Sequence, residues 1–157
     1  MSSLAVIWRA GGLVFSTAVA DVVEVLAPVQ AEPCSAVPGW VRGLFVYRGT
    51  LIPLVDVAGL LGRNPQEDRM SNRVIVVRVG EHAALERAGL WVENVLELDR
   101  PAFEAPGSHP GFWVEQSRFL GKVAQTRYGA VQEVRPRELF TPEQAELLWS
   151  RVKAGAA

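Results

Sequence analysis

The stretch from Val37 to Gly62 constrains the fold of this chain more than any other. It reads VPGWVRGLFVYRGTLIPLVDVAGLLG, an apolar-rich run with few ionisable side chains, interrupted by Gly43, the pair Arg48-Gly49 and Pro53. Glycine tolerates positive φ and close backbone approach, so these positions mark where a strand ends, bends or meets another backbone. The run holds no catalytic constellation, and it therefore favours a protein-docking role over an enzyme.

Two strands are expected inside this run. Residues 44–47 and 50–55 flank Arg48-Gly49, a pair that suits a tight hairpin turn in which Gly49 takes a positive φ. Pro53 lies within the second strand and cannot donate a ladder hydrogen bond. The sequence therefore predicts that this strand lies at a sheet edge or is bulged at Pro53, with a groove-like site on the sheet border.

Short apolar runs separated by turn and loop residues continue along the whole chain. The further expected strands are residues 4–8, 13–15, 22–26, 73–79, 88–98, 112–116, 119–126 and 130–134. About ten short strands favour closed or paired β-barrels over a sandwich of long strands. There is no strict internal repeat, but both halves contain hairpins followed by an apolar strand, a design that suits two barrels.

A helix is expected at the C-terminus, over residues 141–153. Thr141 suits the N-cap, Pro142 the first helical position, and Gln144 the third position of a capping box. One face of this helix collects its apolar side chains, Ala145, Leu148, Trp149 and Val152. A single helical turn is also expected over residues 56–62.

Composition excludes several classes of function. Sixteen basic and seventeen acidic residues give a net charge of −1, which argues against nucleic acid or an anionic membrane as the main partner. Cys34 is the sole cysteine, so the chain cannot form an internal disulfide, and a reducing compartment is expected. The apolar run at residues 4–8 is too short for a signal sequence or membrane span, so we expect a cytoplasmic protein. His82 and His109 lie in loops without ligand-like neighbours, and neither a metal nor a cofactor is expected.

Three blocks of this sequence resemble the CheW family of chemotaxis coupling proteins: VVEVL at residues 22–26, the run at residues 37–62, and RVIVV with GLWVENVLEL further on. The middle block carries the most specific pattern, a proline, a glycine and apolar pairs around Arg48-Gly49 and Pro53. The resemblance implies one domain over residues 1–157, made of two SH3-like five-stranded β-barrels packed side by side. It also implies a non-enzymatic adaptor that ties chemoreceptor cytoplasmic tips to the regulatory domain of a CheA-type histidine kinase, with possible self-association in rings or arrays.

The same resemblance implies where partners bind. Glu24 and Arg48 match a structural pair that forms across the barrel and fixes the loop geometry, while Val22, Gly43 and Val46 match positions near the receptor-facing groove. The candidate partner-binding residues are Val22, Glu24, Trp40, Gly43, Val46, Arg48 and Gly49. Phe45-Val46-Tyr47 departs from the usual aliphatic-Asn-aliphatic lead into Arg-Gly, a variation similar to accessory coupling proteins of non-flagellar chemosensory systems.

Several alternatives remain open from sequence alone. Trp40, Phe45 and Tyr47 suit packing in the core better than contact with a partner. Glu93 and Asn94 interrupt the strand expected over residues 88–98, and they suit alternation on a half-exposed sheet. Another class of function is a β-barrel ligand- or nucleic-acid-binding module of SH3 or OB type, which needs a basic face with exposed aromatics. An inhibitory coupling homologue shares the same fold.

Overall fold

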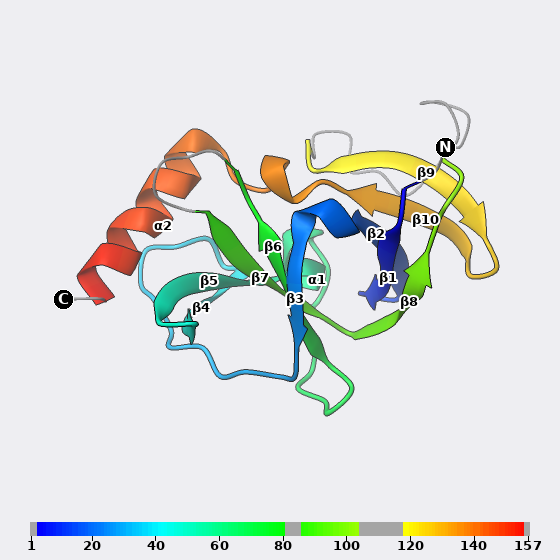
Figure 1. Ribbon diagram of the computed structural model, residues 1–157. Coiled ribbons are helices and arrows are strands. Elements are labelled where there is room, and N and C mark those ends of the chain that lie inside the picture. Colours follow the sequence, from blue (N-terminus) through cyan, green and yellow to red (C-terminus); the bar gives the residue numbers. More distant parts are fainter. Residues whose placement is uncertain (1–2, 81–85, 104–117, 156–157) are drawn as a thin grey trace.

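The computed structural model describes residues 3–80, 86–103 and 118–155. In these residues ten strands form two five-stranded sheets, each curled into a small barrel, and the two barrels lie side by side (Figure 1). A C-terminal helix packs on the outside. The predicted fold class, mainly β with two five-stranded barrels and a C-terminal helix, is confirmed. The expected strand at residues 112–116 lies outside the described residues.

Barrel A takes its strands from both ends of the described chain. They are β1 (Ala5–Ala10), β2 (Leu13–Ala18), β8 (Asn94–Asp99), β9 (Leu120–Thr126) and β10 (Gly129–Val134). Barrel B takes its strands from the continuous middle of the chain. They are β3 (Val22–Leu26), β4 (Val41–Tyr47), β5 (Thr50–Asp56), β6 (Arg73–Arg78) and β7 (Arg87–Val92).

The two barrels share one topology. Their strand orders are β8-β1-β2-β10-β9 and β3-β6-β7-β5-β4, and in each the third and fourth strands are parallel while all other neighbours are antiparallel. The chain visits the five equivalent strand positions in the same cyclic order in both barrels, but it starts at a different strand in each. The two barrels are therefore related as by a circular permutation.

Each barrel is closed by one isolated bridge. The bridge joins the segment that follows the strand at one end of the strand order, β3 or β8, to the strand at the other end, β4 or β9. Glu32, which follows β3, pairs with Leu44 of β4 through N–H···O bonds of 2.8 and 2.9 Å. Phe103, which follows β8, pairs with Ala124 of β9. Closure removes the open sheet edges that would otherwise pair with other chains.

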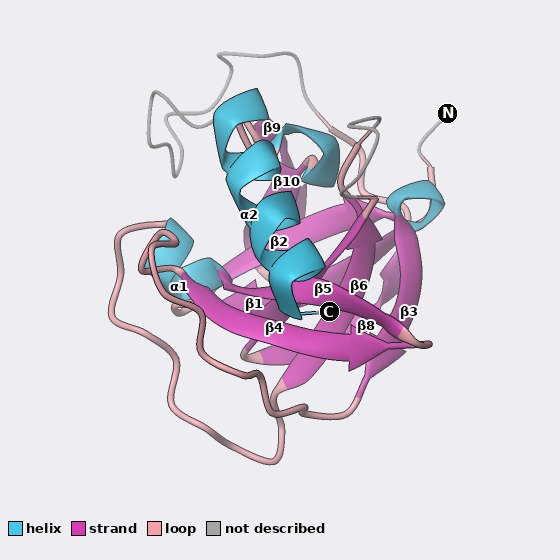
Figure 2. Ribbon diagram, turned by 90° about the vertical axis from the view of Figure 1, so that its left-hand side faces the viewer, coloured by secondary structure: helices cyan, strands magenta, loops and turns pink. Residues whose placement is uncertain are grey.

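The helices are short except at the C-terminus. They are η1 (Val19–Asp21), α1 (Val57–Leu60), η2 (Pro136–Glu138) and α2 (Pro142–Gly155). At the start of α2 the backbone N–H of Gln144 donates to Thr141 Oγ1 at 3.1 Å, and the backbone N–H of Thr141 donates to Gln144 Oε1 at 3.0 Å. This reciprocal capping box starts α2, which lies against β5 (Figure 2).

The single strand expected over residues 88–98 is wrong. The segment divides into β7 of barrel B and β8 of barrel A, and Glu93 lies between them with its backbone N–H donating to the carbonyl of Arg9 at 2.8 Å. The polar residues at this point mark the crossing from one barrel to the other, not alternation along one strand.

The edge or bulge expected at Pro53 is also wrong. Strand β5 lies between β7 and β4, and the bulge lies in β4 between Val41 and Gly43. The parallel ladder of β5 with β7 begins at Leu54, so Pro53 stands just outside it and its missing N–H breaks no bond of that ladder.

One hydrophobic core joins the barrels. It contains Trp8 and Phe15 from barrel A, whose rings stack at 4.9 Å, together with Ile75 and Leu90 from barrel B and Leu148 from α2. All five side chains are buried. Because neither barrel has a separate core of this size, the two barrels form one packed body.

Candidate partner-docking site

Three side chains meet where β3 passes the tip of the β4–β5 hairpin, and we call this group the β3 clamp: Glu24, Tyr47 and Arg48. One carboxylate oxygen of Glu24, Oε2, accepts a hydrogen bond from the Tyr47 hydroxyl at 2.5 Å and another from Arg48 Nη2 at 3.0 Å. A single oxygen thus ties two neighbouring hairpin residues to β3.

Local backbone geometry sets up this meeting. Arg48 and Gly49 have φ angles of +48° and +80°, the two positive values typical of a type I′ hairpin turn. The predicted positive φ of Gly49 is confirmed, and Arg48 shares it. In β3 the register shifts between Val22 and Glu24, so Glu24 is the first residue after a bulge. Bulges re-aim side chains, and this one directs Glu24 toward the turn.

The hydrogen bonds of Glu24 contribute more to the β3 clamp than the attraction between its charged groups. The bond to Glu24, together with burial, raises the pKa of Tyr47 above its ordinary value. The Arg48 guanidinium lies 5.4 Å from the centre of the Tyr47 ring, within range of a cation–π contact. With its side chain 67% exposed, Arg48 gains only about 0 to 1 kcal/mol from its ion pair with Glu24, so its contribution is mainly to the geometry of the turn.

Exposed aliphatic side chains flank the clamp. Val46 is 68% exposed and Val25 is 41% exposed, although both belong to strands of a closed barrel. Phe45 and Tyr47 on either side of Val46 are buried, as predicted for packing residues. Apolar side chains beside a rigid polar group are the usual components of a small protein-docking surface.

The predicted site residues Gly43, Trp40 and Val22 make packing contacts within the protein. Gly43 is buried, and a Cβ there would lie 2.1 Å from the Glu32 carbonyl oxygen. Trp40 is half-buried and its ring stacks on Phe140 at 5.7 Å. Val22 is half-buried against the shared core. Their roles in the structure are to close the barrel and pack the core.

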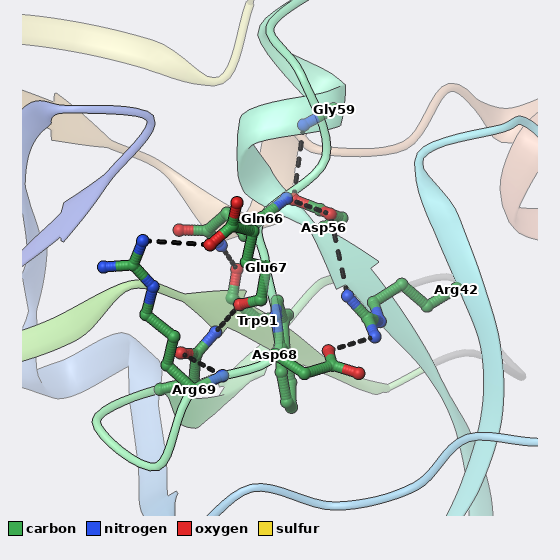
Figure 3. Close-up of polar contacts among 9 residues, drawn as sticks. Arg42, Asp56, Gly59, Gln66, Glu67, Asp68, Arg69 and Trp91 are labelled. Atoms are coloured by element: carbon green, nitrogen blue, oxygen red, sulfur yellow. Dashed lines mark hydrogen bonds and ion pairs between the residues drawn. The ribbon is translucent and has the colours of Figure 1, made fainter.

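A second polar network was not expected from the sequence (Figure 3). Asp56, which is buried, caps α1 by accepting from the backbone N–H of Gly59 at 3.3 Å, and it also accepts from the backbone N–H of Gln66 at 3.1 Å. The Gln66 side chain donates to the carbonyl oxygen of Trp91 at 2.7 Å. These bonds hold the loop after α1 against barrel B.

Arg42 completes this network. Its guanidinium lies 4.5 Å from the centre of the Trp91 ring, 2.8 Å from an Asp68 carboxylate oxygen and 3.9 Å from an Asp56 carboxylate oxygen. The groove beside it has a volume of about 770 Å³ and is lined by Arg42, Trp91, Asp68, Arg69, Met70, the segment from Pro28 to Ala31 and Pro33. The contacts join residues far apart in sequence, and no local motif signals them.

Within the described residues, no group of three or more His, Cys, Asp or Glu side chains is placed to hold a metal ion. Every helix in this part of the chain is too short or too polar to cross a membrane. The candidate docking site consists of the β3 clamp together with the exposed side chains of Val25 and Val46.

Comparison with known proteins identifies the family. The sequence profile of the CheW-like domain matches residues 5–141, which include both barrels and their crossings. The chain belongs to the CheW-like domain family. Its fold is also that of the scaffolding protein TtCheW from Thermoanaerobacter tengcongensis, with a TM-score of 0.76 and 22% identity over 89% of this chain and 93% of TtCheW.

A curated relative carries sequence similarity as well. Protein PilI of Pseudomonas aeruginosa is 36% identical over 91 residues, which make up 58% of this chain and 49% of PilI. The aligned segment thus spans about half the length of that relative.

Proposed function

We propose that this CheW-like chain is a cytoplasmic chemosensory adaptor that couples methyl-accepting chemoreceptors to the regulatory domain of a CheA-type histidine kinase. It works by binding alone and belongs to a non-flagellar branch. Membership of the CheW-like family supports the adaptor role, and similarity to PilI supports the branch.

The observation that carries the proposal is the surface around the β3 clamp. Val46 stands exposed at the tip of a hairpin whose conformation is held by the bonds of Glu24 to Tyr47 and Arg48. A surface ordered before binding loses little conformational entropy when a partner docks. Exposed aliphatic and arginine side chains then supply the contact.

The direct test replaces Arg48 with alanine in a reconstituted assay of receptor, adaptor and kinase. We expect binding to the kinase regulatory domain or the receptor to weaken by about 5- to 30-fold, as for an interface arginine. The matched control is Arg118→Ala, which removes an arginine of similar exposure, 64%, whose 3.6 Å ion pair is with Glu138 and not with the clamp. Equal binding by both variants, with both folded, contradicts the proposal.

The same assay separates an activating adaptor from an inhibitory homologue. An activating adaptor raises kinase autophosphorylation in the presence of receptor, whereas an inhibitory one binds receptor and leaves the kinase inactive. If the chain binds receptor but does not raise kinase autophosphorylation, the docking site is still supported and the chain is an inhibitory homologue.

A further inference from the structure

Barrel A contains a hollow at the end opposite its β9–β10 turn. The hollow lies beside the start of β1, the end of β2 and the segment that follows β8, and its volume is about 490 Å³. Cavities of about 300 to 1,000 Å³ are the usual size of small-molecule sites. The lining includes Ala5, Ser16, Ala18, Phe103, Lys122 and Glu133.

The hairpins of the two barrels show which residues are equivalent. The β4–β5 hairpin is closed by the pair Tyr47–Thr50 and the β9–β10 hairpin by the pair Thr126–Gly129. Leu54 and Glu133 lie at the same distance along the strand from these closing pairs. Glu133 of the hollow therefore takes the place that Leu54 has in barrel B.

The parallel ladders extend this match to β2 and β7. The partner of Leu54 in its ladder is Gly89, and the partner of Glu133 is Ser16. Side chains alternate along a strand, so the next residue on the same face is Trp91 in β7 and Ala18 in β2. Ala18 therefore takes the place of Trp91.

These replacements account for the hollow. Leu54 and Trp91 are buried in the core inside barrel B. Barrel A has a small side chain, Ala18, and an ionisable one, Glu133, at the same two positions. Barrel A thus lacks the aromatic side chain that packs the interior of barrel B, and the space is left open.

A buried hydroxyl group lines the hollow without a hydrogen-bond partner. Ser16 is 1% exposed, and its Oγ makes no hydrogen bond. Thr17 beside it is also buried, but its Oγ1 accepts from Trp8 Nε1 at 3.0 Å. A buried hydroxyl left without a partner is costly. The Ser16 hydroxyl is therefore available to a polar atom of a ligand.

The side chains around the hollow leave one positive charge uncompensated. The carboxylate of Glu133 is paired with Arg135 at 3.1 Å. Lys122 is exposed, and its ammonium group forms no ion pair or hydrogen bond with the part of the chain that the structure describes. A single cation matches the single charge of a carboxylate better than the nearly double charge of a phosphate.

We propose that this hollow binds a small carboxylic acid with an apolar body and a hydroxyl group at its far end. The carboxylate pairs with Lys122 at the exposed mouth, the body packs against Ala18 and Phe103, and the hydroxyl bonds to the buried Ser16. Hydroxyaryl carboxylates are simple ligands of this class. The inference concerns barrel A alone and does not depend on binding to a receptor or a kinase.

A titration of the full chain with 4-hydroxyphenylacetate tests the inference. Heteronuclear NMR should show saturable binding with a Kd of about 10 µM to 1 mM and the largest shifts at the amides of Ala18, Lys122 and Glu133. Phenylacetate lacks the hydroxyl and 4-hydroxyphenylethanol lacks the carboxylate, so each should bind about 3- to 10-fold more weakly. Absence of saturation by about 5 mM, or shifts confined to other parts of the chain, overturns the inference.

Two variants assign the polar contacts. Lys122→Met should weaken binding of 4-hydroxyphenylacetate about 3- to 10-fold and leave 4-hydroxyphenylethanol unchanged. Ser16→Ala should weaken 4-hydroxyphenylacetate by a similar factor and leave phenylacetate unchanged. Lys153→Met is the matched control, because it removes the other lysine of the chain, on α2. Equal affinities of Lys122→Met and Lys153→Met for 4-hydroxyphenylacetate overturn the inference.

A third variant fills the hollow. Ala18→Trp gives barrel A the side chain that barrel B has at the equivalent position, so the variant should keep the Tm of the unmodified chain. Binding of 4-hydroxyphenylacetate should weaken by more than about 30-fold. A folded Ala18→Trp that binds as tightly as the unmodified chain overturns the inference. Where Ala18→Trp does not fold, the comparison of Lys122→Met with Lys153→Met decides.

Discussion

Gly43 offers a sharp test of how barrel B closes. At this residue φ is +143°, and a Cβ would lie 2.1 Å from the carbonyl oxygen of Glu32 and 2.6 Å from its carbonyl carbon. Both are backbone atoms, so no side-chain rotation relieves the clash. Gly43→Ala must therefore move the segment before β4 away from the strand and break the bridge between Glu32 and Leu44.

The cost follows from what that movement removes. The bridge comprises two backbone hydrogen bonds, of 2.8 and 2.9 Å. At about 1 kcal/mol each they account for about 2 kcal/mol. Forcing alanine to a glycine-type φ adds about 1 to 3 kcal/mol. We expect a loss of about 3 to 5 kcal/mol in the free energy of unfolding, which is a large share of a typical domain's stability.

Urea and thermal unfolding followed by circular dichroism measure this loss. A domain of this size should lose about 2 to 4 °C in Tm per kcal/mol, so the Tm should fall by about 6 to 20 °C. Gly49→Ala is the matched control, because Gly49 also has positive φ, +80°, but a Cβ added there would have no other atom within 4 Å. It should lose about 1 kcal/mol, the cost of the left-handed backbone conformation alone. If Gly43→Ala is no less stable than Gly49→Ala, the argument from close backbone approach is refuted.

Two further predictions concern single hydrogen bonds. The chain has two tyrosines, so a Tyr128→Phe variant leaves Tyr47 as its single tyrosine. The ultraviolet titration of this variant should have a midpoint above that of free tyrosine, because the hydrogen bond to Glu24 raises the pKa of Tyr47. The raised pKa means that the bond stabilises the fold fully below the ordinary tyrosine pKa and is lost as pH rises through the folded-state value. Glu24→Gln should lower the midpoint, and a midpoint at or below that of free tyrosine contradicts the assignment. Thr17→Val leaves the buried indole N–H of Trp8 without its 3.0 Å acceptor and should cost about 1 to 3 kcal/mol by urea unfolding, whereas Thr17→Ser should cost less.

Features that depend on neighbouring residues could be predicted from the sequence. The β4–β5 hairpin and the capping box of α2 each follow from a short motif, Arg48-Gly49 and Thr141 to Gln144. Glu24 and Arg48 come from distant segments, and only the family resemblance brought them together. Physical reasoning from the sequence alone had no basis for pairing them.

The failures have a common physical origin. Glu93 ends β7 because its backbone hydrogen bond goes to Arg9 in the other barrel, a partner that strand periodicity cannot indicate. The ion pair between Glu97 of β8 and Arg127 in the β9–β10 turn, for which the sequence made no prediction, depends on the register of two ladders at once. Long-range contacts of this kind are decided by topology, which the pattern of single residues does not encode.

The way in which barrel A draws its strands from both ends of the described chain affects how the protein forms during synthesis. Phe15 of β2 pairs with Gln132 of β10, so a ribosome must add 117 residues before that partner exists. At usual rates of elongation this takes about 6 to 23 s. The β1–β2 hairpin must wait through that interval with unpaired edges and exposed core side chains, while barrel B, made from one continuous segment, can assemble first. Nascent chains of this protein should therefore depend on chaperone protection at their N-terminal hairpin.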